Sequence, residues 1–343
     1  MNEEKFITYL QELLSIPSPT GMTDEVSAYV CSKLKNWDVD HTVNRRGTIT
    51  ARIKGKSEAE AKALISHLDT LGLIVSELKE NGRIAIRDIG YITCRMVEGA
   101  RITIHSRGKK FSGTVLPLKT SNHIYDHHPI NNQEGTWKNL EIRLDEKSAS
   151  KKELVELGIS VGDIVSIHPN TEITSSGFIV SRFLDNHGST ACLLETIEEI
   201  VNSSKKLPND VYFVFTTNEE LDGSGARFIP DNVSEVLAVD IAPVGGVQTS
   251  SEYTCTIGAK DYEMVYDRAL IEKLINLCQK NSINYCVDVF HNLSTDALNV
   301  ITSSKDVLAG YIAFGVDSSH AYERTHIDAI TNLKKLISAY IFG

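Results

Sequence analysis

Two adjacent carboxylates, Glu219 and Glu220, follow an apolar run in the middle of the chain. The run, "VYFVF" at residues 211–215, has the composition of a buried strand, and the pair comes shortly after it within "TTNEELDGSGARF". Burying one unpaired carboxylate is costly, and burying two side by side is worse unless a positive charge lies between them. The pair therefore predicts a cation nearby.

Acids and histidines follow other apolar runs in the same way. The runs "KALIS", "VSRFL", "EVLAV" and "AGYIAFG" are followed, in this order, by His67 and Asp69, by Asp185, by Asp240, and by a segment that contains His320 and His326. In open α/β sheets, functional groups gather beyond the carboxyl ends of the strands. The side chains that follow these runs are therefore candidates for one shared site.

Each candidate has a structural alternative when its segment is taken alone. His67 and Asp69 are two residues apart and share a strand face, but a surface histidine and a turn acid give the same pattern. Asp185 is also placed to cap the helix that follows it. Asp240 ends an apolar run with no helix directly behind it, so the capping alternative is weaker there.

The candidates together form an inventory of nitrogen and oxygen ligands of the kind that zinc and similar divalent ions bind. A pair of divalent cations would offset the concentrated negative charge. One of Glu219 and Glu220 would then coordinate a metal, and the other would stay free beside an activated water. Spacing alone does not choose between His320 and His326, because His326 also suits the start of the last helix.

The N-terminal and C-terminal parts of the chain each alternate between predicted helices and predicted strands. This alternation predicts an α/β fold whose mostly parallel sheet carries helices on both faces. Between these two parts of the chain, short strand-like runs are separated by Gly, Asn and Asp turns. We therefore expect a catalytic domain formed by residues 1–71 and 173–343, with a small all-β domain inserted at residues 72–172.

Composition excludes several classes of protein. The net charge is −10 without any Lys/Arg-rich run, which argues against nucleic acid or an anionic membrane as the main partner. The first residues, "MNEEKFITYLQELL", have the spacing of an amphipathic helix and lack the order of a signal peptide. The six scattered cysteines contain no C-x-x-C and are expected to be reduced thiols of a cytoplasmic protein.

The ordered set of motifs resembles the tetrahedral aminopeptidase family, which includes glutamyl and deblocking aminopeptidases and proteins labelled endoglucanase M. The similarity spans nearly the whole chain and is carried by "LLSIPSPTG", "SHLDTLGLIV", "FLDNHGSTACLLE", "TTNEELDGSGA", "AVDIAP", "STDA" and "SSHAYE". The β insert falls where members of this family carry their small β domain. The resemblance implies a zinc-peptidase-like catalytic domain with two divalent metal ions per subunit, zinc or cobalt.

Roles for individual residues follow from the same resemblance. It implies that Asp185 bridges the two metals, that Glu220 and His320 complete one site, and that His67 and Asp240 complete the other. Glu219 would be the general base, and Asp69 would orient His67. His320 is preferred over His326 because Ser-His followed by the nearby Glu323 resembles the family segment.

Three segments depart from the family pattern. Thr70 stands where an acid is common, Asn186 and His187 replace a frequent Asp-Arg pair, and "LDGSGA" differs from the usual "VGLRGA". None of these changes touches an expected ligand. They leave the choice of substrate open.

The resulting hypothesis is a cytoplasmic dinuclear aminopeptidase that acts on a peptide or small amide and assembles as a homo-oligomer built from dimers, with no nucleic acid or membrane partner. The alternatives are a metal-dependent deacylase or dipeptidase, a glycosidase, and a non-catalytic assembly protein. A glycosidase with Glu219 and Asp240 as its acid pair leaves His67, Asp185 and His320 without a role.

Overall fold

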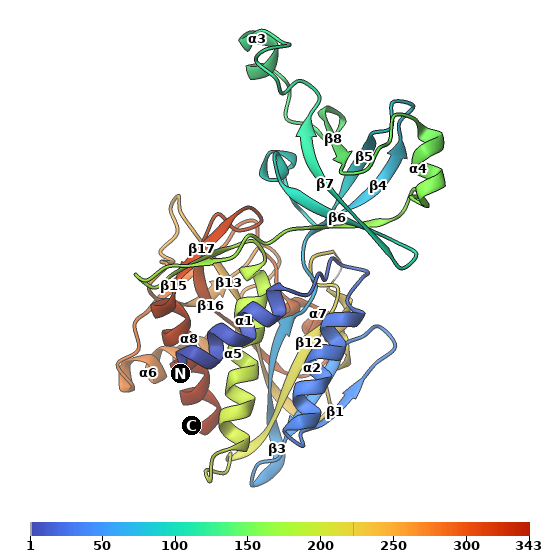
Figure 1. The fold of residues 1–343 in the computed structure, drawn as a ribbon. Coiled ribbons are helices and arrows are strands. Elements are labelled where there is room, and N and C mark those ends of the chain that lie inside the picture. Colours follow the sequence, from blue (N-terminus) through green and yellow to red (C-terminus); the bar gives the residue numbers. More distant parts are fainter. Residues whose placement is uncertain (1, 222) are drawn as a thin grey trace. The chain divides into compact units, whose positions relative to one another are not determined.

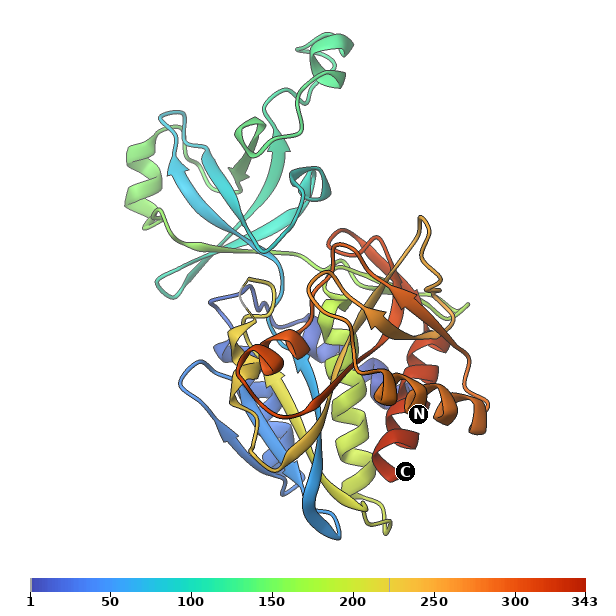
Figure 2. The same ribbon diagram turned by 180° about the vertical axis from the view of Figure 1, so that it is seen from behind.

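The computed structural model describes residues 2–221 and 223–343, which form two units. The first unit runs up to Asp69 and resumes over Asn170–Gly343, and the second unit is Thr70–Pro169. The boundaries predicted from the sequence were 71/72 and 172/173. Figures 1 and 2 show the two units from opposite sides.

The first unit is built on one large sheet. Along the sheet the strands follow the order β1 (Asp40–Val43), β2 (Ile49–Ile53), β12 (Asn209–Thr216), β3 (Ser57–His67), β13 (Val233–Val244), β16 (Leu308–Asp317), β17 (Glu323–His326), β11 (Phe178–Ser181) and β10 (Glu172–Ile173). Strand β14 (Cys255–Lys260) pairs with both β16 and β15 (Tyr285–Val289).

The sheet is mixed, which corrects the predicted mostly parallel arrangement. Its centre is parallel, because β12, β3, β13 and β16 run in the same direction, and β14 and β15 are also parallel to each other. The outer pairs are antiparallel. Short connections such as the one from β16 to β17 impose this direction, since a parallel neighbour requires a long crossover.

Helices cover both faces of the sheet. The helices of this unit are α1 (Glu3–Leu14), α2 (Asp24–Asn36), α5 (Leu184–Val201), α6 (Arg268–Lys280), α7 (Asp296–Thr302) and α8 (Ile327–Phe342), with a short 3-10 helix η3 (Ser224–Phe228). Side chains alternate along β3: Ser66 meets Thr190 of α5, whereas Ile65 packs in one cluster with Val300 of α7. The α/β class with helices on both faces is thus present in the structure.

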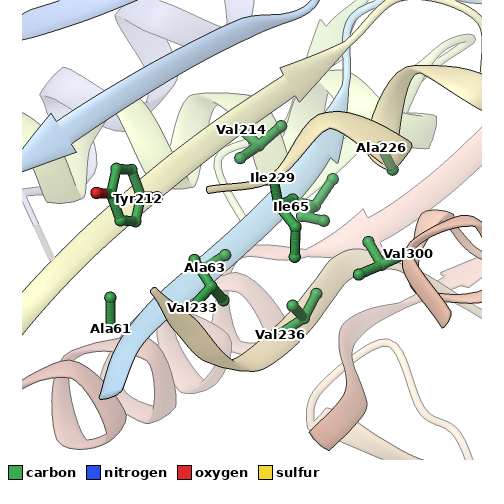
Figure 3. Close-up of a cluster of buried hydrophobic side chains, with 10 residues drawn as sticks. All are labelled: Ala61, Ala63, Ile65, Tyr212, Val214, Ala226, Ile229, Val233, Val236 and Val300. Carbon is green, nitrogen blue, oxygen red and sulfur yellow. The ribbon is translucent and has the colours of Figure 1, made fainter. Parts of the chain in front are cut away.

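The apolar cluster on the α7 side of the sheet fixes the central strands. Figure 3 shows Ala61, Ala63 and Ile65 of β3 beside Tyr212 and Val214 of β12. The cluster is completed by Ala226, Ile229, Val233, Val236 and Val300. Burying side chains of this kind stabilises a fold by about 1.5–3 kcal/mol for each large residue. This packing holds the ends of β3, β12 and β13 in register.

The second unit is a small closed barrel. Its strands are β4 (Gly72–Leu78), β5 (Ile84–Ile89), β6 (Arg101–Ser106), β7 (Lys109–Pro117), β8 (Leu140–Leu144) and β9 (Ile164–Ile167), in the spatial order β4-β5-β8-β7-β6-β9. Their pairs are antiparallel. Closure leaves no strand edge exposed for unwanted pairing.

The barrel unit also contains short helices, which are η1 (Cys94–Val97), α3 (His127–Asn131), η2 (Trp137–Asn139) and α4 (Lys151–Leu157). Helix α4 lies within "SKKELVELGI", where the Ser150 hydroxyl accepts from the Glu153 amide and Gly158 ends the helix with a φ of 103°. Within the described ranges of both units, we find no helix that is both long and apolar enough to cross a membrane.

Candidate metal centre

The predicted site residues converge at one edge of the sheet. His67 ends β3, Glu219 and Glu220 follow β12, and Asp240 lies where β13 extends beyond its pairing with β3. These three strands are parallel neighbours, so their carboxyl ends meet at the same edge. Asp185 arrives from the first turn of α5.

Helix α5 is tied to this edge by hydrogen bonds to β13. The Asn186 amide donates to the Val239 carbonyl at 3.0 Å, and the Ser189 hydroxyl donates to the Asp240 carbonyl at 3.2 Å. These bonds place the first turn of α5, and with it Asp185, directly over the strand that carries Asp240. Asn186 is one of the departures from the family pattern, and its side-chain NH₂ group makes this contact.

Asp185 lies between two imidazoles. Its Oδ1 is 3.1 Å from Nε2 of His67, and its Oδ2 is 3.4 Å from Nε2 of His320. Each imidazole has a further carboxylate beside it. Nε2 of His320 is 3.6 Å from Oε2 of Glu220, and Nε2 of His67 is 3.9 Å from Oδ1 of Asp240. The five predicted ligands therefore lie together, with Asp185 in the middle.

The donor atoms suit a cation. Atoms of His67, Asp185 and Glu220 lie within 4.8 Å of one another, and all three residues are buried. Oε1 of Glu220 is buried and has no hydrogen-bond partner among residues 2–221 and 223–343, which is costly for a carboxylate unless a ligand satisfies it. Mixed imidazole and carboxylate donors are the set that zinc and neighbouring divalent ions bind.

Crowding of acids at this edge shifts their protonation. Burial, followed by the charge of neighbouring acids, raises the pKa of Glu219, Glu220 and Asp240 well above the ordinary value. Burial also disfavours charged Asp185, but its bonds to the two histidines outweigh this and lower its pKa. Ionising all four carboxyl groups around two imidazoles would create an excess of negative charge, which a divalent cation would relieve.

Asp69 contacts His67 through its backbone carbonyl and the two glutamates through its carboxylate. Nδ1 of His67 is 2.9 Å from the Asp69 carbonyl, and it is 3.6 Å from the Asp69 carboxylate. The carbonyl can only accept, so Nδ1 carries the proton and Nε2 faces the centre. The carboxylate instead accepts the Thr20 hydroxyl at 2.7 Å and the amides of Glu219 and Glu220 at 3.1 and 3.3 Å.

His326 is occupied by a structural role. Its Nδ1 accepts from the amide of Asp328 at 3.1 Å, which caps α8, and its Nε2 donates to the Ser176 carbonyl at 2.9 Å. Both ring nitrogens are therefore used. The backbone of Asp185 is non-helical, with φ −76° and ψ 105°, and its two carboxylate oxygens face His67 and His320. Among the alternatives left open by spacing, His320 is the histidine that reaches the site.

Two buried acids at the site had no role in the expectations from the sequence. Asp296 accepts the Thr216 hydroxyl at 2.5 Å, and its charge contributes to the raised pKa of both Glu219 and Asp240. It lies in "STDA", a segment that only family resemblance singled out. Glu323 accepts two backbone amides at the site, and its closeness to His320 in the chain was the available signal.

The amino-acid sequence of this chain is similar to those of known proteins. The sequence profile of the family described as M42 glutamyl aminopeptidase matches residues 47–336. The candidate aminopeptidase YhfE of Bacillus subtilis (strain 168) is 40% identical over 338 residues, which cover 98% of this chain and 97% of YhfE.

Solved structures of aminopeptidases share the fold. Aminopeptidase APDkam598 of Desulfurococcus kamchatkensis superposes with a TM-score of 0.87 at 23% identity, covering 99% of this chain and 95% of its own. The TET1 peptidase of Pyrococcus horikoshii, which can assemble into a tetrahedron or a large octahedral shell, gives 0.85 at 22% identity, with 98% and 99% covered. The chain therefore belongs to the M42 glutamyl aminopeptidase family and is a metallopeptidase, which confirms the predicted resemblance to the tetrahedral aminopeptidases.

Proposed function

We propose that this chain is a dinuclear metal-dependent aminopeptidase that removes N-terminal residues from peptides. The observation that carries the proposal is the position of Asp185, whose two carboxylate oxygens face His67 and His320 separately. One carboxylate with an imidazole on each side is the arrangement expected of a ligand shared by two cations. Glu220 and Asp240 then supply one further carboxylate on each side.

The residues divide into two ligand sets. One divalent ion would be held by Asp185, Glu220 and His320. The other would be held by Asp185, His67 and Asp240. Zinc or cobalt suits these donors. When bound, such ions supply Lewis acidity, which lowers the pKa of a water molecule and polarises the scissile carbonyl.

Glu219 belongs to neither ligand set, and we assign proton transfer to it. Its Oε2 lies 3.7 Å from Nε2 of His67, at the edge of the ligand cluster, and Asp69 holds its backbone amide. As the general base it takes a proton from the attacking water and then gives that proton to the leaving amine. In the metal-free chain, burial and then the neighbouring Asp240 raise its pKa well above the ordinary value.

We further propose a cytoplasmic homo-oligomer built from dimers, in which the barrel unit Thr70–Pro169 contributes to contacts between subunits and to substrate access. Support comes from the TET1 peptidase, which can assemble into a tetrahedron or a large octahedral shell. The six cysteines are free thiols, as in a reducing compartment. The substrate is a peptide or small amide rather than nucleic acid or membrane lipid.

A chelator-sensitive assay tests the proposed reaction. Purified protein is offered aminoacyl anilides, N-acyl amino acids and oligosaccharides, each with and without added Zn²⁺ or Co²⁺. Metal-dependent release from the aminoacyl anilides, which carry a free α-amine, is expected. Exclusive cleavage of N-acyl amino acids would instead identify a deacylase built on the same centre.

A further inference from the structure

We propose that Glu323 is a positioning residue that sets the main chain of two metal ligands, Asp185 and His320, before any cation binds. The inference rests on the proposed metal centre. Glu323 itself contributes no oxygen to either ligand set. It acts through the backbone amides of the residues that do.

Glu323 joins two segments that are far apart in the sequence. Its side chain is 2% exposed at the start of β17. Oε2 accepts the backbone amide of Asp185 at 3.1 Å, and Oε1 accepts the backbone amide of His320 at 3.0 Å. Each oxygen therefore holds one ligand residue, so the carboxylate fixes the separation between the start of α5 and the β16–β17 turn.

The backbone that Glu323 holds is in an unfavourable conformation. His320 has a φ of 60° and Ser318 a φ of 59°, and Phe183, two residues before Asp185, has a φ of 69°. Residues with a Cβ rarely adopt left-handed φ values, and such values persist where surrounding contacts determine the conformation. The bond from His320 to Glu323 is one of those contacts, and the turn it supports aims the imidazole at Asp185.

Other buried carboxylates in the first unit, which are not among the proposed ligands, also accept two backbone amides, and they show the ordinary structural use of this pattern. Asp261 accepts the amides of Glu263 and Met264, and Asp288 accepts those of Thr249 and Ser250. In both cases the two amides are neighbours in one loop. Glu323 differs because its two amides belong to separate segments and both carry proposed ligands.

Asp69 provides a parallel on the other side of the centre. Its carboxylate accepts the amides of Glu219 and Glu220 as well as the hydroxyl of Thr20. The two carboxylates together hold the main chain of four site residues. Partners of this kind orient the ligands, and losing one typically weakens metal affinity about tenfold to hundredfold.

The test is a Co²⁺ titration of the metal-free full chain, followed by visible absorption, for the wild type and Glu323→Gln. Glutamine keeps the shape but replaces one accepting oxygen with a donor NH₂ group, so only one of the two amides keeps its partner. We expect two bound Co²⁺ ions in the wild type. In Glu323→Gln, affinity for at least one ion should fall about tenfold to hundredfold, and raised Co²⁺ should restore kcat/KM.

Asp288→Asn is the matched control, because it damages a buried carboxylate clamp whose partners Gln248, Thr249 and Ser250 lie in the loop after β13. It should lower the melting temperature of the metal-free protein and leave both Co²⁺ affinities unchanged. Glu323→Asp keeps the charge but is one methylene shorter, so it should weaken Co²⁺ less than Glu323→Gln, and it decides the question if Glu323→Gln does not fold. Wild-type affinities in the folded Glu323 variants overturn the inference, whereas a wild type that binds no Co²⁺ contradicts the proposed metal centre itself.

Discussion

The carboxylate of Asp185 lies 3.1 Å from the imidazole of His67, although Asp185 lies in the first turn of α5 and His67 ends β3. Its second oxygen is turned to His320, which belongs to the turn after β16. Three elements from distant parts of the chain thus meet at one side chain. Any loss at Asp185 is therefore expected to affect both halves of the proposed centre, whereas losses at the other ligands should affect one half.

The two adjacent glutamates should respond differently to the same substitution. Glu219→Gln keeps the proposed ligands, so both metals and the fold should be retained while kcat falls about a hundredfold to ten-thousandfold, the usual scale of general acid–base catalysis. Glu220→Gln removes a ligand, so metal content should fall together with kcat. Mass spectrometric metal analysis beside kcat for each variant checks this.

Two results would contradict the roles assigned to Glu219 and Glu220. If Glu219→Gln loses metal and Glu220→Gln keeps it, the two roles are reversed. If both variants keep their metal and near-normal turnover, the pair does not belong to the active site.

Removing metal should abolish activity reversibly. Prolonged chelation leaves the buried acids around Asp185 without a compensating charge, and Zn²⁺ or Co²⁺ should restore peptidase activity. Binding should also stabilise the fold by about 2.7 kcal/mol when the free ion is at a hundredfold its Kd. Thermal melting across a Co²⁺ series measures that gain, and full turnover in rigorously metal-free protein would falsify the metal-dependent mechanism.

Excising the barrel unit should separate folding from assembly. We expect a variant in which a short linker replaces residues 70–169 to keep the α/β unit folded, because that unit has its own core in the β3–β12–β13 cluster. Its oligomeric state should change. Light scattering of the variant beside the full chain checks this, and an unchanged number of subunits per particle would show that the barrel is dispensable for assembly.

Lys62 should make stability depend on alkaline pH. Its side chain is 6% exposed in β3, and its ammonium donates to the Tyr340 carbonyl of α8 at 2.7 Å. Burial, with the nearby charge of Lys273, lowers its pKa from 10.5 to about 8. Between these values the unfolded chain binds more protons than the folded one, so the free energy of unfolding should rise with pH.

Lys62→Met provides the comparison for this pH dependence. Its stability, relative to the wild type, should decline by about 3 kcal/mol as pH rises from 8 to 10.5, because only the wild type is relieved of a buried charge over that range. Urea denaturation of both proteins at several pH values measures the difference. Parallel pH profiles would show that Lys62 is solvated in the folded state.

The sequence by itself determined the inventory of chemistry. Acids and histidines that follow apolar runs are visible without a structure, because residue type and periodicity are local properties of the chain. The α/β texture and the change to short strands in the middle are local in the same sense. The family resemblance added roles, since it rests on the order of motifs such as "SHLD", "FLDNHG" and "TTNEE".

Only the tertiary structure decided which of these residues meet. His326 and His320 are equivalent by spacing, and they differ because Asp328 and Ser176 engage both nitrogens of His326. The mixed direction of the sheet depends on which strands pair, and pairing joins distant segments. The use of Glu323 to hold Asp185 and His320 was equally hidden, because a hydrogen bond between residues from different elements leaves no periodic signal in the sequence.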